Sequence, residues 1–443
     1  MPTVIGIVFL LLALYCFAKG SGKLFSLLIF SGIFQAATVF TTVSVAPYYL
    51  VAVFFIIRAA ADLFLSRTTT HRVKGLAPLL VLGVLGIVSA FLYPHIFSGI
   101  PVYDPRLGLD DQLLWQSSLE FSGANKYQAV LLGINVTVVV FGAFISVEMD
   151  KLRKALVAAY VTLTFILLLQ FGALFAGVSL PMSLINNDQN YYLSSASLEM
   201  PRPSGTFPEP SMAAPILVGA TLSTLALYMK RGKGLWMIGC CLAGVAVVAS
   251  AASFLTLAVG VPAILLRYPF FRFPYYLKIG RFSRVIVLLV FGSFSLLLLA
   301  VPRVRDTMVD QIVNKGSSDS FLARSAADLF ALQLVYKTYG IGVGLGSNRP
   351  SSLAATIAST MGVAGLLLFI FLVLRLLQND LGDYYWLKWM TLGVVFDMAF
   401  GVPDLNAPFL WILFALLAHR ARWPSFASVE DPDFVRNGAV VKC

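Results

Sequence analysis

Residues 76–103 read LAPLLVLGVLGIVSAFLYPHIFSGIPVY and contain no Asp, Glu, Lys or Arg. Residues 155–187 form a second stretch without any charged side chain. Each stretch is longer than the roughly 20 apolar residues with which a helix crosses a bilayer. The chain has 443 residues, of which 59% are hydrophobic and 12% are charged, whereas about a quarter are charged in a soluble domain. The composition therefore predicts an integral membrane protein.

The apolar pattern predicts an all-α polytopic bundle of about 12–13 transmembrane helices. The expected helices lie near residues 3–17, 24–42, 47–65, 76–97, 128–148, 155–178, 212–229, 235–249, 252–266, 285–302, 352–374, 386–402 and 405–418. We expect a single transmembrane domain over residues 1–423 and a polar cytoplasmic tail over residues 424–443. The continuous apolar run 235–266 is assigned to two short helices with a turn near residues 250–253. A single helix would put its flanking basic clusters in opposite compartments.

Basic clusters follow alternate helices and predict the orientation of the bundle. They comprise Lys19 and Lys23; Arg67, Arg72 and Lys74; Lys151, Arg153 and Lys154; Lys230, Arg231 and Lys233; the segment 267–284; and Arg420 with Arg422. The positive-inside rule places them in the cytoplasm and the N-terminus outside. The net charge of +11 is therefore explained by contact with the lipid bilayer, and no nucleic-acid partner is expected.

Three long loops are expected on the outer face, at residues 98–127, 179–211 and 303–351. They carry arginines and lysines, which the positive-inside rule does not predict there. Because loops longer than about 15 residues are usually functional or disordered, we expect function in the last two. No internal repeat is evident.

The second outer loop ends in the turn RPSGTFPEPS, residues 202–211. Its prolines and glycine predict a rigid irregular turn that leads into the next membrane helix. Either Glu209 or Ser211 can cap that helix, whose positive end points outward. Together with Arg202, the helix N-terminus would form an anion site. The alternative is a structural cap with an Arg202–Glu209 ion pair, and it stays open.

The third outer loop carries a second group of candidate residues. Residues 321–336 have the pattern of an amphipathic helix that could lie along the outer membrane surface, with Arg324 and Asp328 one turn apart. GIGVGLGSNRP follows at 340–350, where alternating glycines would let the backbone approach a ligand closely. Asn348 and Arg349 precede the next membrane helix and are candidates for substrate binding. A flexible hinge with a snorkelling arginine is the alternative reading.

The sequence contains no metal-binding motif such as HExxH and no nucleotide-binding P-loop. The three histidines, His71, His95 and His419, lie outside the 179–211 and 303–351 loops. We therefore expect neither a metal nor a cofactor.

Three stretches resemble, in order, the O-antigen polymerase and O-antigen ligase superfamily of bacterial membrane glycosyltransferases of the GT-C type. They are RPSGTFPEPS at 202–211, Arg324 followed by GIGVGLGSN at 340–348, and STMGVAGLLLF at 359–369. The expected helix number and the two large outer loops also agree with the family, so the resemblance covers residues 128–418. The motifs are short, and their specificity comes from their combination.

The resemblance implies a multi-pass protein of the bacterial inner membrane whose active site faces the periplasm. It implies a donor and an acceptor that are both glycans linked to polyprenyl diphosphate, or lipid A core as the acceptor in a ligase. It also implies a flippase and a chain-length regulator as partner proteins. Ligases of this family resemble one another in a histidine on the late outer loop. This chain has none there, which favours a polymerase over a ligase.

For this reaction, Arg202, Arg324 and Arg349 are the candidates that would stabilise the leaving diphosphate. Glu209 is the candidate general base for the acceptor hydroxyl, and Asp328 is the reserve candidate. Asn348 and Ser211 complete the expected substrate-binding residues. Two alternatives from other functional classes stay open. One is a lipid-linked oligosaccharide flippase or exporter, and the other is an assembly scaffold without enzymatic activity.

Overall fold

A computed structural model describes residues 1–65, 73–103, 116–188, 203–232, 234–268 and 319–422. These residues form thirteen α-helices and one small antiparallel ribbon of two strands. The helices are α1 (Val4–Lys19), α2 (Ser21–Ser31), α3 (Pro47–Leu65), α4 (Leu76–Ile96), α5 (Gly123–Phe144), α6 (Met149–Ala176), α7 (Pro210–Arg231), α8 (Leu235–Val248), α9 (Ala251–Arg267), α12 (Asp319–Lys337), α13 (Leu353–Leu377), α14 (Trp386–Gly401) and α15 (Pro408–Arg422). The strands are β1 (Pro101–Tyr103) and β2 (Gln116–Ser118). The helix expected at 285–302 lies outside the described residues.

Six of the described helices, α3, α4, α5, α6, α7 and α13, are long and apolar enough to cross a membrane. Five shorter helices, α1, α2, α8, α9 and α15, are also apolar. This confirms an almost entirely helical bundle with six helices that could cross a membrane. The higher count of 12–13 spanning helices and the orientation of the bundle stay predictions. Below, "outer face" means the end of the bundle at which α7 and α13 begin.

The expected helix at 24–42 is wrong over its second half, because α2 ends at Ser31. The backbone beyond it makes hydrogen bonds to distant segments in place of helical ones. The N–H groups of Gln35 and Ala36 both donate to the Thr206 carbonyl, at 3.0 and 2.9 Å. The N–H of Thr38 donates to the Asn187 side chain at 2.7 Å. The segment after α2 therefore packs against the outer turn that precedes α7.

The apolar run 235–266 is two helices, as predicted. The chain breaks at Ala249, whose φ of 47° is left-handed, and α9 resumes at Ala251. The two helices make few contacts with each other and both pack on α7, while α9 also packs on α14. The break thus separates two short helices that are each held by their neighbours.

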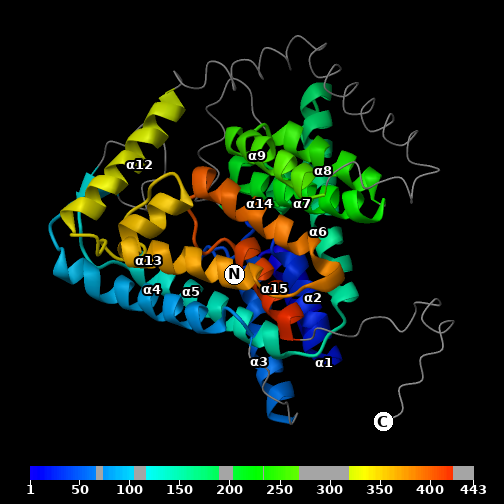
Figure 1. The fold of residues 1–443 in the computed structure, drawn as a ribbon, viewed down its shortest axis with the longest axis horizontal. Coiled ribbons are helices and arrows are strands. Elements are labelled where there is room, and N and C mark those ends of the chain that lie inside the picture. The colour runs from blue at the N-terminus through cyan, green and yellow to red at the C-terminus, as the bar shows by residue number, and fades with distance from the viewer. Residues whose placement is uncertain (66–72, 104–115, 189–202, 233, 269–318, 423–443) are drawn as a thin grey trace.

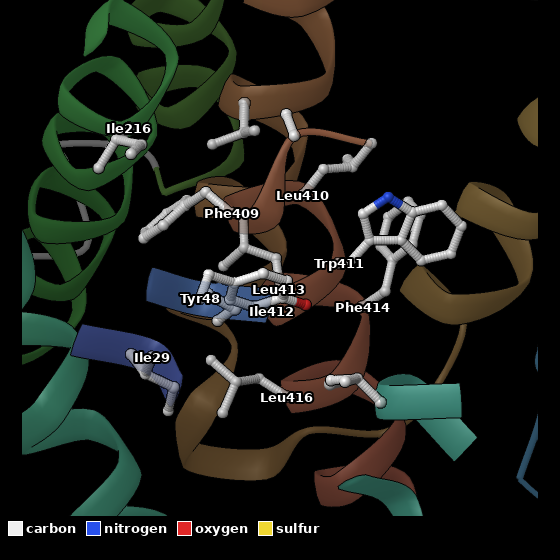
Figure 2. Packing of buried hydrophobic residues seen from close by; sticks show 14 of the residues in the cluster. Ile29, Tyr48, Ile216, Phe409, Leu410, Trp411, Ile412, Leu413, Phe414 and Leu416 are labelled. Atoms are coloured by element: carbon white, nitrogen blue, oxygen red, sulfur yellow. The ribbon is translucent and has the colours of Figure 1, made fainter. Parts of the chain in front are cut away.

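Helix α15 lies at the centre of the bundle (Figure 1). Its residues from Leu410 to Ala418 have no exposed surface. Figure 2 shows Phe409 on one side of this helix and Trp411 with Phe414 on the other, with Tyr48 of α3 close to it. A helix that is apolar on all sides is stable only when other helices surround it. The core therefore forms around α15, chiefly against α5 and α14.

Helix α13 is broken at Gly362, whose φ of 75° and ψ of −177° are not helical. The glycine turn that precedes α13, residues 340–346, fills this break. Its N–H groups at Val343 and Gly344 donate to the carbonyls of Ser359 and Thr360, at 2.8 and 2.9 Å. In return, the Gly340 carbonyl accepts the N–H of Val363 at 2.9 Å. The close approach that these glycines permit is therefore to the protein's own backbone.

We expect Gly344→Ala to destabilise the protein by about 1–3 kcal/mol or more, since the residue has a φ of 102°, which strains an L-residue. A Cβ atom there would also lie 2.8 Å from the Ser89 carbonyl and from Pro94. Thermal unfolding of the purified protein in detergent measures the effect.

The matched control is Gly239→Ala on α8, where a Cβ atom would meet nothing within 4 Å. This change should leave stability unchanged or raise it by about 0.5–1 kcal/mol. Equal melting temperatures for the two variants would contradict the role given to the glycine turn.

Candidate functional site

The first half of the outer turn, residues 203–207, is largely buried and fixed by hydrogen bonds. Gly205 has a φ of 65°. Its N–H donates to the Gln170 side chain at 2.7 Å, and its carbonyl accepts from Gln170 and from Asn186 at 3.3 and 3.1 Å. The Thr206 hydroxyl donates to a carbonyl near the end of α2. The turn is thus a rigid base from which the next residues project.

Glu209 projects from that base at the N-cap position of α7, but its side chain does not cap the helix. The carboxylate accepts the Ser211 hydroxyl at 3.2 Å. Its other contact is with Arg324 of α12, whose guanidinium Nη2 lies 3.8 Å from the same oxygen, Oε2. The described parts of the two outer loops therefore meet at this ion pair.

This ion pair is long and half-buried. The Arg324 and Glu209 side chains keep 34% and 26% of their surface exposed. At 3.8 Å the contact is an ion pair without a direct hydrogen bond. The first N–H groups of α7 also have no side-chain cap. The Arg324 guanidinium therefore lies beside the N-terminus of α7. Among the described residues, the guanidinium has only a long ion pair, and the helix N-terminus has no side-chain cap.

Ser351 fixes α12 to the start of α13. Its N–H donates to the Asp328 carboxylate at 2.7 Å, and its hydroxyl donates to the Arg324 carbonyl at 3.2 Å. Asp328, the reserve candidate for the general base, is therefore engaged in holding the backbone that follows the glycine turn.

A second pair of charges lies on the same face. Burial raises the pKa of the Asp404 carboxyl above its ordinary value, while the N–H of Asn406 and the positive charge of Arg349 act to lower the pKa. Asp404 belongs to the loop between α14 and α15, which is joined to α13 by the Thr356 hydroxyl on the Pro403 carbonyl at 2.9 Å. The sequence analysis did not single out Asp404. A lone carboxylate in a short proline-flanked outer loop was the available signal.

Asn348 is buried, and both ends of its side chain contact the protein. Its oxygen accepts the N–H of Tyr103 at 3.1 Å, and its nitrogen donates to the Ser359 hydroxyl at 3.3 Å. The first outer loop reaches α12 at the same place, where the rings of Tyr103 and Phe330 lie 4.4 Å apart. Asn348 thus joins the β1–β2 ribbon to the break in α13.

Arg202 lies outside the described residues, so its expected role beside Arg324 at one diphosphate stays a prediction. One hollow of about 430 Å³ lies on α12 and is lined by Leu329, Leu332, Gln333, Tyr336 and Lys337. Neither Glu209 nor Arg324 lines this hollow, so it is not the site. Within the described residues, no three His, Cys, Asp or Glu side chains gather as metal ligands.

Comparison of the chain with protein-family models and with curated proteins finds no match. The functional reading therefore rests on the site itself and on the short motifs in the sequence. The site consists of two acidic and two basic side chains from four separate segments. They are Glu209, Arg324, Arg349 and Asp404.

We expect the Glu209–Arg324 pair to contribute little to folding, since partly exposed ion pairs are typically worth about 0–1 kcal/mol. A double-mutant cycle with Glu209→Ala, Arg324→Ala and the double variant, followed by unfolding in detergent, measures the coupling. A coupling energy of several kcal/mol would mean that the pair is structural.

Proposed function

We propose that this protein is a polysaccharide polymerase of the O-antigen or exopolysaccharide type in the bacterial inner membrane. It would transfer a glycan from a polyprenyl diphosphate carrier to a sugar hydroxyl of a second lipid-linked glycan, at the periplasmic face. The observation that carries the proposal is the pairing of Glu209 with Arg324 at the uncapped N-terminus of α7. The motifs at 202–211 and 340–348 support the same family.

The chemistry requires a cationic group beside the leaving diphosphate. In the transfer step, the bond between the sugar anomeric carbon and the diphosphate oxygen breaks, and a bond from that carbon to the acceptor oxygen forms. Negative charge collects on the diphosphate, where a guanidinium and helix N–H groups stabilise it. Arg324 can supply that guanidinium because, among the described residues, its charged group has only a long ion pair. Arg202 and Arg349 would add further charge.

The acceptor hydroxyl loses its proton in the same step. Glu209 is the best-placed general base, since its carboxylate is partly exposed and, within the described part of the chain, accepts one hydrogen bond, from Ser211. Displacement of Arg324 by the diphosphate would free the carboxylate to accept the proton. Asp328 is less suited because it accepts the Ser351 N–H. The ion pair thus joins the two groups that the reaction needs.

A ligase would use the same chemistry with lipid A core as the acceptor, and a flippase would move the donor without bond cleavage. The products separate the three readings. A polymerase forms a ladder of sugar chains from lipid-linked repeat units, a ligase forms glycosylated core, and a flippase forms neither.

We expect purified protein to convert lipid-linked repeat units from its own cell into such a ladder. Glu209→Gln should retain the fold and donor binding but lose turnover by roughly 10²-fold or more, because the amide cannot accept the proton. Gel analysis of the products, beside donor binding and protein yield, measures these effects.

The control is Glu148→Gln, an exposed carboxylate that precedes α6, which should leave turnover unchanged. Fully active, donor-binding Glu209→Gln protein would remove Glu209 from the mechanism. Arg324→Lys should recover only part of the activity lost in Arg324→Ala, because a lysine lacks the bidentate guanidinium.

We also expect the reaction to need no divalent metal, since guanidinium groups supply the positive charge. Treatment with a chelator should leave the rate of the purified protein unchanged. Loss of activity that Mg²⁺ or Mn²⁺ restores would contradict this expectation.

A further inference from the structure

Asp397 lies on α14, four residues before its last residue, and its surface is 0% exposed. Neither carboxylate oxygen has a hydrogen-bond partner among the described residues. The hydroxyl oxygen of Ser253, which is also fully buried, lacks a partner in the same part of the chain. Buried polar groups are nearly always hydrogen-bonded. Two such groups on neighbouring helices therefore point to something that binds between them.

The first turn of α9 lies against this part of α14. The hydroxyls of Ser253 and Thr256 face the Asp397 carboxylate. Thr256 donates its hydroxyl hydrogen to the Ala252 carbonyl at 2.8 Å, so the lone pairs of its oxygen stay available. On the other side, a Cβ atom on Gly401 would lie 3.8 Å from the carboxylate oxygen Oδ1. Side-chain oxygens from three residues thus gather without bonding to one another.

The lack of hydrogen bonds favours a cation over a proton as the occupant. A protonated carboxyl would donate a hydrogen bond to a neighbouring oxygen, whereas neither Asp397 oxygen makes a hydrogen bond to a described residue. A hard cation is bound by several oxygens at about 2.3–2.6 Å. Oxygens that face a carboxylate without a hydrogen bond to it fit this second arrangement.

The charge of the ion follows from the charge of its ligands. Asp397 is the one carboxylate in this group, and the hydroxyls are neutral. A monovalent cation gives a neutral site, whereas a divalent cation would leave a net positive charge among apolar helices, which is costly. The break between α8 and α9 also leaves carbonyls at the end of α8 without helical donors, and such carbonyls suit alkali cations.

We infer that Asp397, Ser253 and Thr256 form a binding site for a small monovalent cation, of the size and charge of sodium. The bound ion joins α9 to α14 directly beneath the outer loop that carries Asp404. This inference does not depend on the proposed polymerase activity, since it concerns a separate group of residues.

The test is thermal unfolding of the full-length protein in detergent, at constant ionic strength, with sodium chloride replacing choline chloride stepwise. A ligand that binds only the folded state raises stability with the logarithm of its concentration. We expect the melting temperature to rise in this way with sodium and to rise less with potassium. Equal melting temperatures in sodium and choline, or a dependence on pH alone, would overturn the inference.

Variants assign the effect to the site. Asp397→Asn should lose the response to sodium and should be more stable than the native protein in choline, because the buried charge is gone. Asp380→Asn changes an exposed carboxylate after α13 and should respond as the native protein does. Ser253→Ala should need about tenfold more sodium for the same rise in melting temperature. This variant provides the test if Asp397→Asn does not fold. A normal sodium response in both Asp397→Asn and Ser253→Ala would refute the assignment.

Discussion

The arrangement of the outer face depends on the backbone hydrogen bonds between the glycine turn 340–346 and the break in α13. A helix broken in an apolar surrounding leaves carbonyls that must find donors within the protein. Here Val343 and Gly344 supply those donors to Ser359 and Thr360. Because Arg349 follows the turn within a few residues, its position is set by this pairing. The positions of α12 and Arg324 follow in turn, through the contacts of the segment that joins the glycine turn to α13.

The long helices could be predicted from sequence because hydropathy and loop charge are local properties. The same reasoning located the break between α8 and α9 and the helix α12, although α12 does not have the segregated apolar face that was expected. It failed after Ser31, where the sequence is still apolar but the backbone bonds to Thr206, which is far away in the chain. The sequence also did not show that the alternating glycines pack against the protein's own backbone. Their contacts lie at the break in α13, and the kink at Gly362 has no strong sequence signal. Non-local backbone pairing thus accounts for these differences.

The candidate site could be predicted only in part, for a similar reason. The arginines and Glu209 stand out because charges are rare in this chain. That Glu209 pairs with Arg324 could not be read from the sequence, because Arg202 is much nearer along the chain. Asp404 gains its importance only from the position of Arg349. The candidate site residues could therefore be identified from the composition, whereas the residues that they contact could be identified only from the structure.

The turn before α7 combines a rigid half and an exposed half, and this division suits a site for a charged lipid-linked substrate. Gly205 and its neighbours are buried and bonded to α6 and to the segment after α2, so they fix the direction of the helix N-terminus. Glu209 and Arg324 lie beyond that base, and the described residues hold their side chains by one hydrogen bond and one long ion pair. In the proposed reaction, a diphosphate would displace the carboxylate from the guanidinium without moving the backbone. The rigid half keeps the helix N–H groups in place while the side chains exchange partners, which is the preorganisation that charge stabilisation requires.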